Sequence, residues 1–418
     1  PPPLSRSRAP RARPGGSCVG RVSCVFASSP ATPGQEHKEP LLIPRAVGLL
    51  DETGAEVMPT AVLELSETEQ TFDFPELASK PIPSILRGFS APVVLQHDAS
   101  DNVRAKLLAH DTDPFNKWEA GRTLAQSLLV RMVTQDAPPA TAYLDGLAAV
   151  LRDDSLDPAF RALLLRLPSE EDTAQAIFDG GGTPDPSAIN QAHETLKLHI
   201  AQHLQDMLPR IYAQMTVTGP YKPDAVSAGK RAFGNAALSL ISKLDGGKQA
   251  AAQFATANNM TQQLGALRAL LMISTGQQEL VAFEDQWQHD RLVMDKWFSL
   301  QVSLAAPEKA APTAEMLAQH PAFDIKNPNR FRAVFGGLKA NTAGFHHGSG
   351  NSYALLADWL IKLDAINPQT TARISSAFDT WKRYDADRQS KMQAALKRIA
   401  QTPDLSGDTT EMVTRILG

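Results

Sequence analysis

The chain has 418 residues, 43% of them hydrophobic, which is enough for two or three domains with buried cores. Charged residues interrupt its apolar runs well before the roughly 18–20 residues that a membrane-spanning helix needs, so we expect no membrane segment. With 41 basic and 45 acidic residues the net charge is −4, which excludes a general attraction to nucleic acid or to anionic lipid.

Residues 1–30 differ in composition from the rest of the chain. They carry five arginines and many prolines, and no acidic residue precedes Glu36. Organelle transit peptides are rich in Arg and Ser and poor in acids, so one interpretation is a plastid or mitochondrial transit peptide. The other is out-of-frame translation joined to a real protein near Pro30, because scattered prolines do not suit an amphipathic helix. Both interpretations predict a disordered tail over residues 1–30.

The two cysteines, Cys18 and Cys24, both lie in this tail. The rest of the chain is free of cysteine, so its stability does not depend on disulfides and a reducing compartment is compatible with it. We therefore expect a cytoplasmic protein, or an organellar one if the tail is a transit peptide.

Residues 31–112 show the pattern of strands and turns. Short runs alternate between apolar and polar residues with period two, as half-buried strands do. Proline cannot donate to a sheet ladder, so the proline-containing segments 81–83 and 91–95 are predicted to be edge or connecting strands. The predicted strands are too few for a complete sandwich, so we expect a small, incomplete β-sandwich. The clearest runs are residues 41–43, 47–50, 62–65 and 71–74.

Residues 113–418 show only helical patterns. Asp113-Pro114 combines an N-cap acceptor with proline at the first helical position, and Asn327-Pro328 and Asn367-Pro368 repeat this combination. Ser169 and Asp172 have the spacing of a capping box. We expect about fifteen helices of 10–20 residues with short connections, stacked as an α-helical superhelix or solenoid. Without a strict sequence repeat, the motifs of armadillo, HEAT and TPR proteins are not met.

Apolar stripes mark the buried faces of these helices. Phe331, Val334, Phe335 and Leu338 fall on one face, as helical spacing requires. Ile374, Phe378 and Trp381 form a second such stripe, which predicts two helices packed into a common core.

The histidines of residues 193–203 do not complete a zinc motif. His193 begins like the zinc-peptidase pattern, but Lys197 stands where the second histidine is needed. His199 and His203 have the spacing of one helical turn, yet Ile200 replaces the glutamate that would serve as general base. We therefore predict no metal site and no catalytic residue here, and expect these histidines on a solvated helix face.

Two other polar clusters are open to interpretation. His346 and His347 lie in a glycine-bounded loop, which is either an ordinary connector or the lining of a pocket. Arg383, Asp385, Asp387 and Arg388 are expected to form a solvated face of paired charges, each pair worth a few tenths of a kcal/mol.

Several unusual segments, in the same order along the chain, resemble bacterial-type aminopeptidase N (alanyl aminopeptidase), a family of zinc metallopeptidases. The resemblance covers roughly residues 31 to 418, and so many ordered segments are a specific signal. The segments are Thr32-Pro33-Gly34-Gln35, Ser84-Ile85-Leu86-Arg87-Gly88-Phe89-Ser90-Ala91-Pro92, Asp113-Pro114-Phe115-Asn116-Lys117-Trp118-Glu119-Ala120, Ala257-Asn258-Asn259-Met260-Thr261, Leu292-Val293-Met294-Asp295-Lys296-Trp297-Phe298, Asn327-Pro328-Asn329-Arg330, Lys382-Arg383-Tyr384-Asp385 and Leu405-Ser406-Gly407-Asp408.

The resemblance implies the later part of that family: the end of a β-sandwich over residues 31–112 and a helical superhelix over residues 113–418. The family's zinc motif and its Gly-x-Met-Glu-Asn motif are absent from this chain. The resemblance implies that full-length members of the family bind zinc, act on peptide substrates and have a catalytic domain that this chain lacks. The chain itself is expected to bind no zinc and to be inactive alone.

The resemblance also implies a supporting role, because the family's superhelix encloses the substrate cavity. By matching position, Arg332, Gln369 and Arg373 are the expected cavity-wall residues, and the guanidinium groups of the two arginines could hold a peptide carbonyl or carboxylate. Ordinary inter-helix salt bridges are the alternative for these residues. For the whole chain, the alternative is a non-catalytic α-solenoid that binds a protein or peptide.

Overall fold

The structure is a computed structural model, and it describes residues 4–8, 18–26, 34, 41–77 and 80–418. The chain divides into two compact units. Unit 1 comprises residues 1–128, 140–157 and 163–167, and unit 2 comprises residues 129–139, 158–162 and 168–418.

Unit 1 contains two sheets. One has the strand order β5-β2-β1-β7 and the other the order β4-β3-β6. All neighbouring strands are antiparallel except β1 and β7, which are parallel. The strands are β1 (Leu4–Arg8), β2 (Cys18–Phe26), β3 (Ile43–Leu50), β4 (Glu56–Leu65), β5 (Glu69–Leu77), β6 (Ile82–Ile85) and β7 (Val94–His97).

The segments 4–8 and 18–26 correct the expectation of a disordered tail. β1 pairs with β2 and β7, and β2 pairs with β5 from Cys18 opposite Leu77 to Val25 opposite Glu69. The run of residues 18–26 contains three valines and a phenylalanine, residues that favour strands. The arginines and prolines of the tail hid this signal. The remaining residues of the predicted tail lie outside the described residues.

The core of the sandwich is built from both sheets. Ile43, Val47 and Leu49 of β3 alternate toward it and are nearly inaccessible, while Phe72 and Phe74 of β5 pack against them. Both proline-containing segments lie where the sequence predicted, since β6 and β7 are each the last strand of their sheet. An edge strand has one side without a partner, so a missing N–H does least harm there.

The first helix begins earlier than the predicted boundary at Asp113. α1 (Asp101–His110) follows Ser100, whose side chain accepts a hydrogen bond from the Val103 backbone N–H at 3.3 Å. Its apolar residues bury one face against the rest of unit 1. A serine before an acidic first turn is a start signal that the sequence analysis missed.

A buried arginine of unit 1 joins the sandwich to its first helices. Arg87 follows β6 in the short helix η1 (Arg87–Phe89) and is 4% exposed. Its guanidinium pairs with Glu56 and, at 3.2 Å, with Asp111, and its Nε donates to the Ser84 hydroxyl at 2.8 Å. These contacts give Ser84 and Arg87, two residues of the Ser84–Pro92 segment, a structural role.

Gly48 is required by the same arrangement. A Cβ atom at this position would lie 2.0 Å from the Arg87 Cζ atom, so the guanidinium rests directly on the β3 backbone. No other residue leaves room for this close approach.

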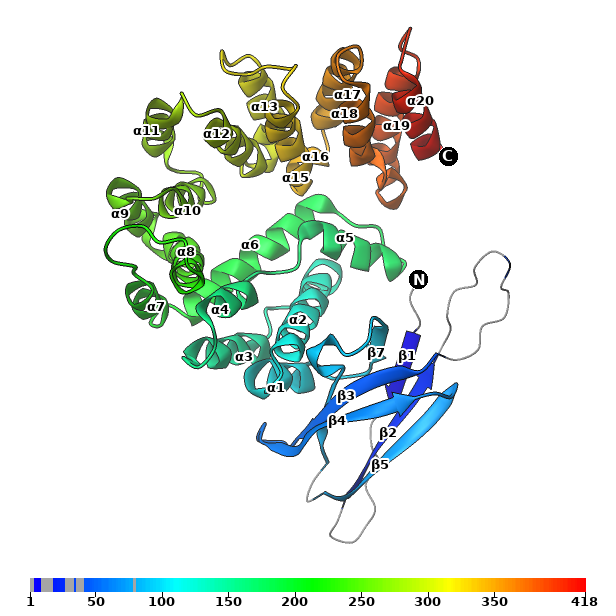
Figure 1. The fold of residues 1–418 in the computed structure, drawn as a ribbon. Coiled ribbons are helices and arrows are strands. Elements are labelled where there is room, and N and C mark those ends of the chain that lie inside the picture. The colour runs from blue at the N-terminus through cyan, green and yellow to red at the C-terminus, as the bar shows by residue number, and fades with distance from the viewer. Residues whose placement is uncertain (1–3, 9–17, 27–33, 35–40, 78–79) are drawn as a thin grey trace. The chain divides into compact units, whose positions relative to one another are not determined.

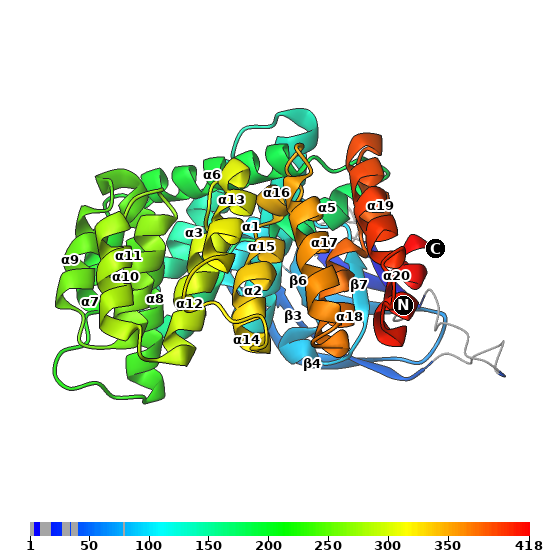
Figure 2. The same ribbon diagram turned by 90° about the horizontal axis from the view of Figure 1, so that it is seen from above.

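Unit 2 is built almost entirely of helices. Figures 1 and 2 show them side by side in chain order from α8 through α12 and α17 to α20. Of the helices after α1, α3 (Thr141–Arg152) belongs to unit 1, and α2 (Pro114–Gln135) and α4 (Pro158–Leu164) have residues in both units. The helices of unit 2 alone are α5 (Glu170–Asp179), α6 (Pro186–His203), α7 (Leu208–Gln214), α8 (Ala225–Asp245), α9 (Lys248–Thr256), α10 (Met260–Leu271), α11 (Gln277–Trp287), α12 (Arg291–Ser303), α13 (Ala310–Ala318), α14 (Pro328–Phe331), α15 (Gly337–Ala340), α16 (Thr342–Phe345), α17 (Asn351–Asp364), α18 (Pro368–Ser375), α19 (Ala386–Ala400) and α20 (Gly407–Leu417).

The predicted fold class, a helical superhelix preceded by a small β-sandwich, is confirmed. The described residues contain the helices α1–α20 rather than about fifteen, because some continuous stretches are divided. For example, a π-helical turn η3 (Arg332–Gly336) separates α14 from α15. Among these residues no helix is long and apolar enough to cross a membrane.

The predicted helix starts are also confirmed. Asn327 accepts from the Arg330 N–H, Asn367 from the Thr370 N–H, and Asp113 from the Asn116 N–H. Ser169 and Asp172 form the capping box that their spacing indicated. Both predicted apolar stripes are buried in the main core of unit 2.

Arginines near residue 385 join distant parts of unit 2, and Arg388 lies 3.8 Å from Asp185, the N-cap of α6. Arg383, in the short helix η5 (Trp381–Arg383), pairs with Glu171 of α5 at 2.5 Å and donates to the Gln175 side chain at 3.2 Å. It is 5% exposed, so the expectation of a solvated charge is wrong for Arg383. Arg388 pairs with Asp385 at 2.6 Å as expected, but its side chain is only 14% exposed and its Nε donates to the His346 carbonyl at 2.7 Å. We call the contacts of Arg383 with α5 the clasp.

Candidate functional site

The predicted cavity-wall residue Arg332 lies at the start of the π-helical turn. Phe331, Val334 and Phe335 around it are fully buried, and this turns the Arg332 side chain to the exposed face. Its Nε donates to the Pro328 carbonyl at 3.1 Å and its Nη2 to the Asn329 side chain at 2.6 Å. Neither acceptor is charged, so the guanidinium keeps its positive charge available. Single π turns are frequent at functional sites.

Arg332 lines an open groove of about 720 Å³ on the surface of unit 2. The groove crosses α10, α12 and the α14–η3 segment, and its walls combine aliphatic and cationic side chains. Leu292 is 68% exposed there, which is unusual for a leucine. The lining residues are Leu264, Gly265, Arg268, Leu292, Asp295, Lys296, Ser299, Leu300, Asn329, Arg332 and Ala333.

The charge of this groove is predominantly positive. Its one acidic lining residue, Asp295, is neutralised by Arg330, whose Nε donates to it at 2.6 Å. Lys296 is exposed and has no ionic partner among the described residues. Neither Lys296 nor Arg332 pairs with a carboxylate among the described residues, so their charges are not neutralised within that part of the chain.

Gln369 and Arg373 lie one turn apart on the exposed face of α18. The N-cap Asn367 fixes the start of this helix, and Thr371 and Ile374 bury its opposite face. Neither Gln369 nor Arg373 forms a side-chain hydrogen bond within the part of the chain that the structure describes. The alternative of an ordinary inter-helix salt bridge is therefore not seen for Arg373.

The three predicted residues do not form one contact cluster. The only described hydrogen bond between the Arg332–Ala340 segment and the end of α18 joins the Lys339 ammonium to the Ser376 hydroxyl, at 3.4 Å. Lys339, like Arg332, is exposed. The three residues thus belong to neighbouring exposed faces of unit 2, and Lys296 and Lys339 add two cations that the sequence analysis did not select.

The histidines near residue 200 do not fit a zinc site. His193 is 3% exposed and its Nε2 is 3.1 Å from the Thr173 hydroxyl, so the expectation of a solvated helix face is wrong for it. The His199 Nδ1 bonds the Thr195 carbonyl at 2.9 Å, and His203, one turn further along α6, is exposed. Among the described residues, no three His, Cys, Asp or Glu side chains gather as metal ligands.

The His346–His347 segment is a connector between α16 and α17. His346 is buried, its Nδ1 lies 2.8 Å from the Tyr353 hydroxyl, and its ring stacks on Tyr384 at 4.1 Å. Burial lowers the pKa of His346 to about 3, so the ring is neutral at physiological pH. This residue belongs to the core and not to a ligand pocket.

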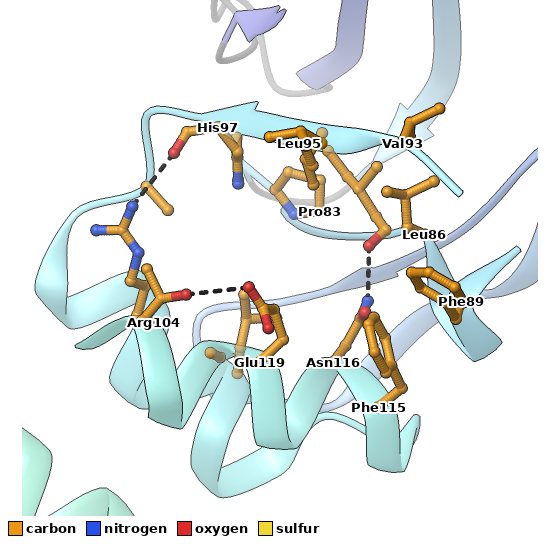
Figure 3. Close-up of a pocket in the computed structure, with 16 residues that line it drawn as sticks. Pro83, Leu86, Phe89, Val93, Leu95, His97, Arg104, Phe115, Asn116 and Glu119 are labelled. Carbon is orange, nitrogen blue, oxygen red and sulfur yellow. Dashed lines mark hydrogen bonds between the residues drawn. The ribbon is translucent and has the colours of Figure 1, made fainter. Parts of the chain in front are cut away.

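Unit 1 has its own apolar hollow of about 350 Å³, shown in Figure 3. Its polar groups are engaged within the fold. Arg104 donates to the His97 carbonyl at 3.3 Å, and Asn116 to the Ile85 carbonyl at 3.0 Å. Burial raises the pKa of Glu119 and lowers that of His97. The Thr123 hydroxyl, which also lines the hollow, donates to the Glu119 carboxylate at 3.3 Å.

The fold defines a helical-repeat domain with an immunoglobulin-like sandwich, and the groove gives the helical part a cation-rich surface. The described residues contain no cluster of metal ligands. Residues 101–418 match the family described as a domain of unknown function, DUF3458_C, ARM repeats. Residues 25–98 match its companion DUF3458, with an Ig-like fold. The chain belongs to this family. The exclusion of armadillo repeats by motif is thereby overturned, because the repeat lies in the helix arrangement and not in a visible sequence period.

The predicted resemblance to aminopeptidase N is confirmed. The chain is 39% identical over 381 residues to aminopeptidase N of Caulobacter vibrioides, covering 89% of this chain and 44% of that protein. It is 35% identical over 412 residues to aminopeptidase N of Escherichia coli, covering 94% and 47%. The chain therefore spans about half the length of the curated relatives it matches.

A solved structure agrees with these relatives. The crystal structure of Legionella pneumophila aminopeptidase A in complex with aspartic acid superposes with a TM-score of 0.84 at 27% identity. The match covers 100% of this chain and 49% of that one.

Proposed function

We propose that this chain is the helical cap of a zinc aminopeptidase, an enzyme that removes N-terminal residues from peptides. In this role the chain shapes the substrate cavity and contributes side chains to its wall, while zinc and the catalytic residues belong to the part of the relatives that has no counterpart here. The observation that carries the proposal is the cation-rich groove that Arg332 lines. The carboxylate in its lining, that of Asp295, is already paired with Arg330. The relatives do not favour the alternative of a non-catalytic solenoid.

The chemistry of the wall follows from its charges. The Arg332 guanidinium, the Arg373 guanidinium and the Gln369 amide all carry N–H donors on exposed faces of unit 2. A bound peptide presents backbone carbonyls along its length and a carboxylate at its C-terminus, and both are acceptors. The wall would thus hold the distal part of a peptide while its N-terminus is processed elsewhere. Leu292 and Leu300 would contact its apolar side chains.

The first test measures the activity of the isolated chain. We expect no hydrolysis of an alanyl anilide and no bound zinc after dialysis against a zinc buffer. Stoichiometric zinc together with turnover would refute the proposal, because the chain would then hold a catalytic centre.

The second test measures peptide binding by calorimetric titration. We expect a peptide with a free C-terminus to bind the 418-residue chain more tightly than its C-terminal amide. The variants Arg332→Gln and Arg373→Gln should each weaken binding about three- to tenfold, as expected for an exposed charge-assisted hydrogen bond. Arg415→Gln, an exposed arginine of α20, is the matched control. Equal binding by all variants would remove Arg332 and Arg373 from the cavity wall.

A further inference from the structure

A second, smaller hollow of about 200 Å³ lies in unit 2, between the end of α7, the middle of α8 and the turn from α9 to α10. It is separate from the groove of Arg332, with which it shares no lining residue. Its walls are mostly polar. They are formed by Tyr212, Met215, Thr216, Val217, Arg231, Gly234, Asn235, Gln253, Thr256, Ala257, Asn258 and Gln262.

The cation of this hollow is buried and has no acidic partner in the described part of the chain. Arg231 is 4% exposed, and its guanidinium stacks on the Tyr221 ring at 4.6 Å. Its Nη2 donates to the Lys222 carbonyl at 2.8 Å, but its buried Nε has no acceptor among the described residues. No aspartate or glutamate lines the hollow. An uncompensated buried charge is costly, so the geometry calls for an anion beside Arg231.

The neighbouring amides can also donate to an anion. The Asn258 side-chain nitrogen reaches the Gly219 carbonyl at 3.5 Å, and the Asn235 nitrogen reaches the Thr261 carbonyl at 3.0 Å. Each amide nitrogen carries two hydrogens, so one on each remains for a ligand. In contrast, the Gln253 side chain uses both of its N–H groups, on the Asn235 oxygen and on the Gln262 carbonyl.

We propose that this hollow binds a small oxyanion, namely a carboxylate or phosphate group. The planar guanidinium suits two oxygens of one such group, and the amides of Asn235 and Asn258 supply additional donors. The bound anion would neutralise Arg231 and link α8 to the turn between α9 and α10. This site does not depend on the proposed function, because it needs neither a peptide nor a catalytic partner.

The test uses the 418-residue chain and two probes, inorganic phosphate and acetate, titrated calorimetrically at constant ionic strength against chloride. Arg231→Gln removes the charge and keeps a donor for the Lys222 carbonyl. Ala257→Leu leaves Arg231 intact and places a larger side chain in the hollow. Arg210→Gln, an exposed arginine of α7, is the matched control.

We expect saturable binding of at least one probe, weakened at least tenfold in Arg231→Gln and in Ala257→Leu and unchanged in Arg210→Gln. Binding of phosphate but not of acetate assigns a phosphate site. Binding of acetate, with or without phosphate, assigns a site that accepts a carboxylate. If neither probe saturates, or if binding survives in Ala257→Leu, the proposal is wrong. The Ala257→Leu result decides the question if Arg231→Gln does not fold.

Discussion

Replacing Arg87 with methionine tests how the sandwich of unit 1 is held to its first helices. The substitution preserves much of the apolar volume and removes the guanidinium. Glu56 and Asp111 lose their ionic partner, and the Ser84 hydroxyl loses a donor. Because the Asp111 side chain is 0% exposed, it cannot turn to water to replace that partner.

The size of the effect follows from this burial. Removing one member of a buried ion pair typically costs about 3–5 kcal/mol, because a charge is left uncompensated. Glu56 is about one-third exposed and should add little. Since a whole domain is stable by only about 5–15 kcal/mol, Arg87→Met should bring unit 1 close to unfolding.

The pH dependence of this effect has a definite sign. Burial raises the pKa of Asp111, and the nearby Arg87 opposes this rise. Without Arg87 the pKa of Asp111 rises further above its unfolded value. A raised carboxyl pKa favours folding at low pH, and that stability is lost as pH rises through the folded pKa. The variant should therefore be less destabilised at about pH 4 than at about pH 7.

Hydrogen exchange read by mass spectrometry measures unit 1 locally and uses unit 2 as an internal reference. We expect exchange in β3 and β6 to accelerate about 100-fold or more at neutral pH, since about 1.4 kcal/mol corresponds to a factor of ten. Arg104→Met, a partly exposed arginine of α1, is the matched control. Adding Asp111→Asn to Arg87→Met should restore most of the protection. Less than tenfold acceleration, or no recovery in the double variant, would refute the reasoning.

Three further predictions concern packing, protonation and the clasp. Gly48→Ala should lower the stability of unit 1 by at least about 1–3 kcal/mol in thermal unfolding, because its Cβ would overlap the Arg87 guanidinium. His346 has a pKa of about 3 against an ordinary 6.5, so urea unfolding should show stability falling as pH drops below about 6.5, by up to about 5 kcal/mol from this residue. Arg383→Met should destabilise unit 2 by about 1–3 kcal/mol in urea unfolding, since its partner Glu171 is half exposed.

Each of these has a control or a contrary outcome. Gly407→Ala meets no atom within 4 Å and should be harmless by comparison with Gly48→Ala. Stability that stays level or increases between about pH 6.5 and pH 4 would contradict the assignment of a neutral buried His346. Arg398→Met changes an exposed arginine of α19, so a loss equal to that of Arg383→Met would show that the clasp has no special role.

Local patterns predicted most of the elements. The caps at Asp113, Asn327 and Asn367 depend only on a side chain and the next few N–H groups, so the sequence suffices to place them. The stripes around Phe335 and Phe378 are equally local, because helical period alone decides which residues share a face. These signals also supported the predicted fold class.

Tertiary context decided what the sequence analysis missed. Arg383 and His193 look like surface residues in sequence, but packing against α5 buries both. The valines of residues 18–26 were outweighed by the arginines and prolines around them, and only pairing with β5 shows their strand. Of the candidate site, Arg332, Gln369 and Arg373 came from resemblance. The contribution of Lys296 required knowing that Arg330 neutralises Asp295.

The clasp also bears on how unit 2 folds. Stacked helical repeats usually touch only their neighbours, so they can gain or lose terminal repeats one at a time. Here Arg383 bonds Gln175 across 208 positions of the chain, so helices near the two ends of unit 2 depend on each other. A contact of such long range forms late and slowly, but once made it suppresses fraying from either end. The stack should therefore melt as one cooperative body.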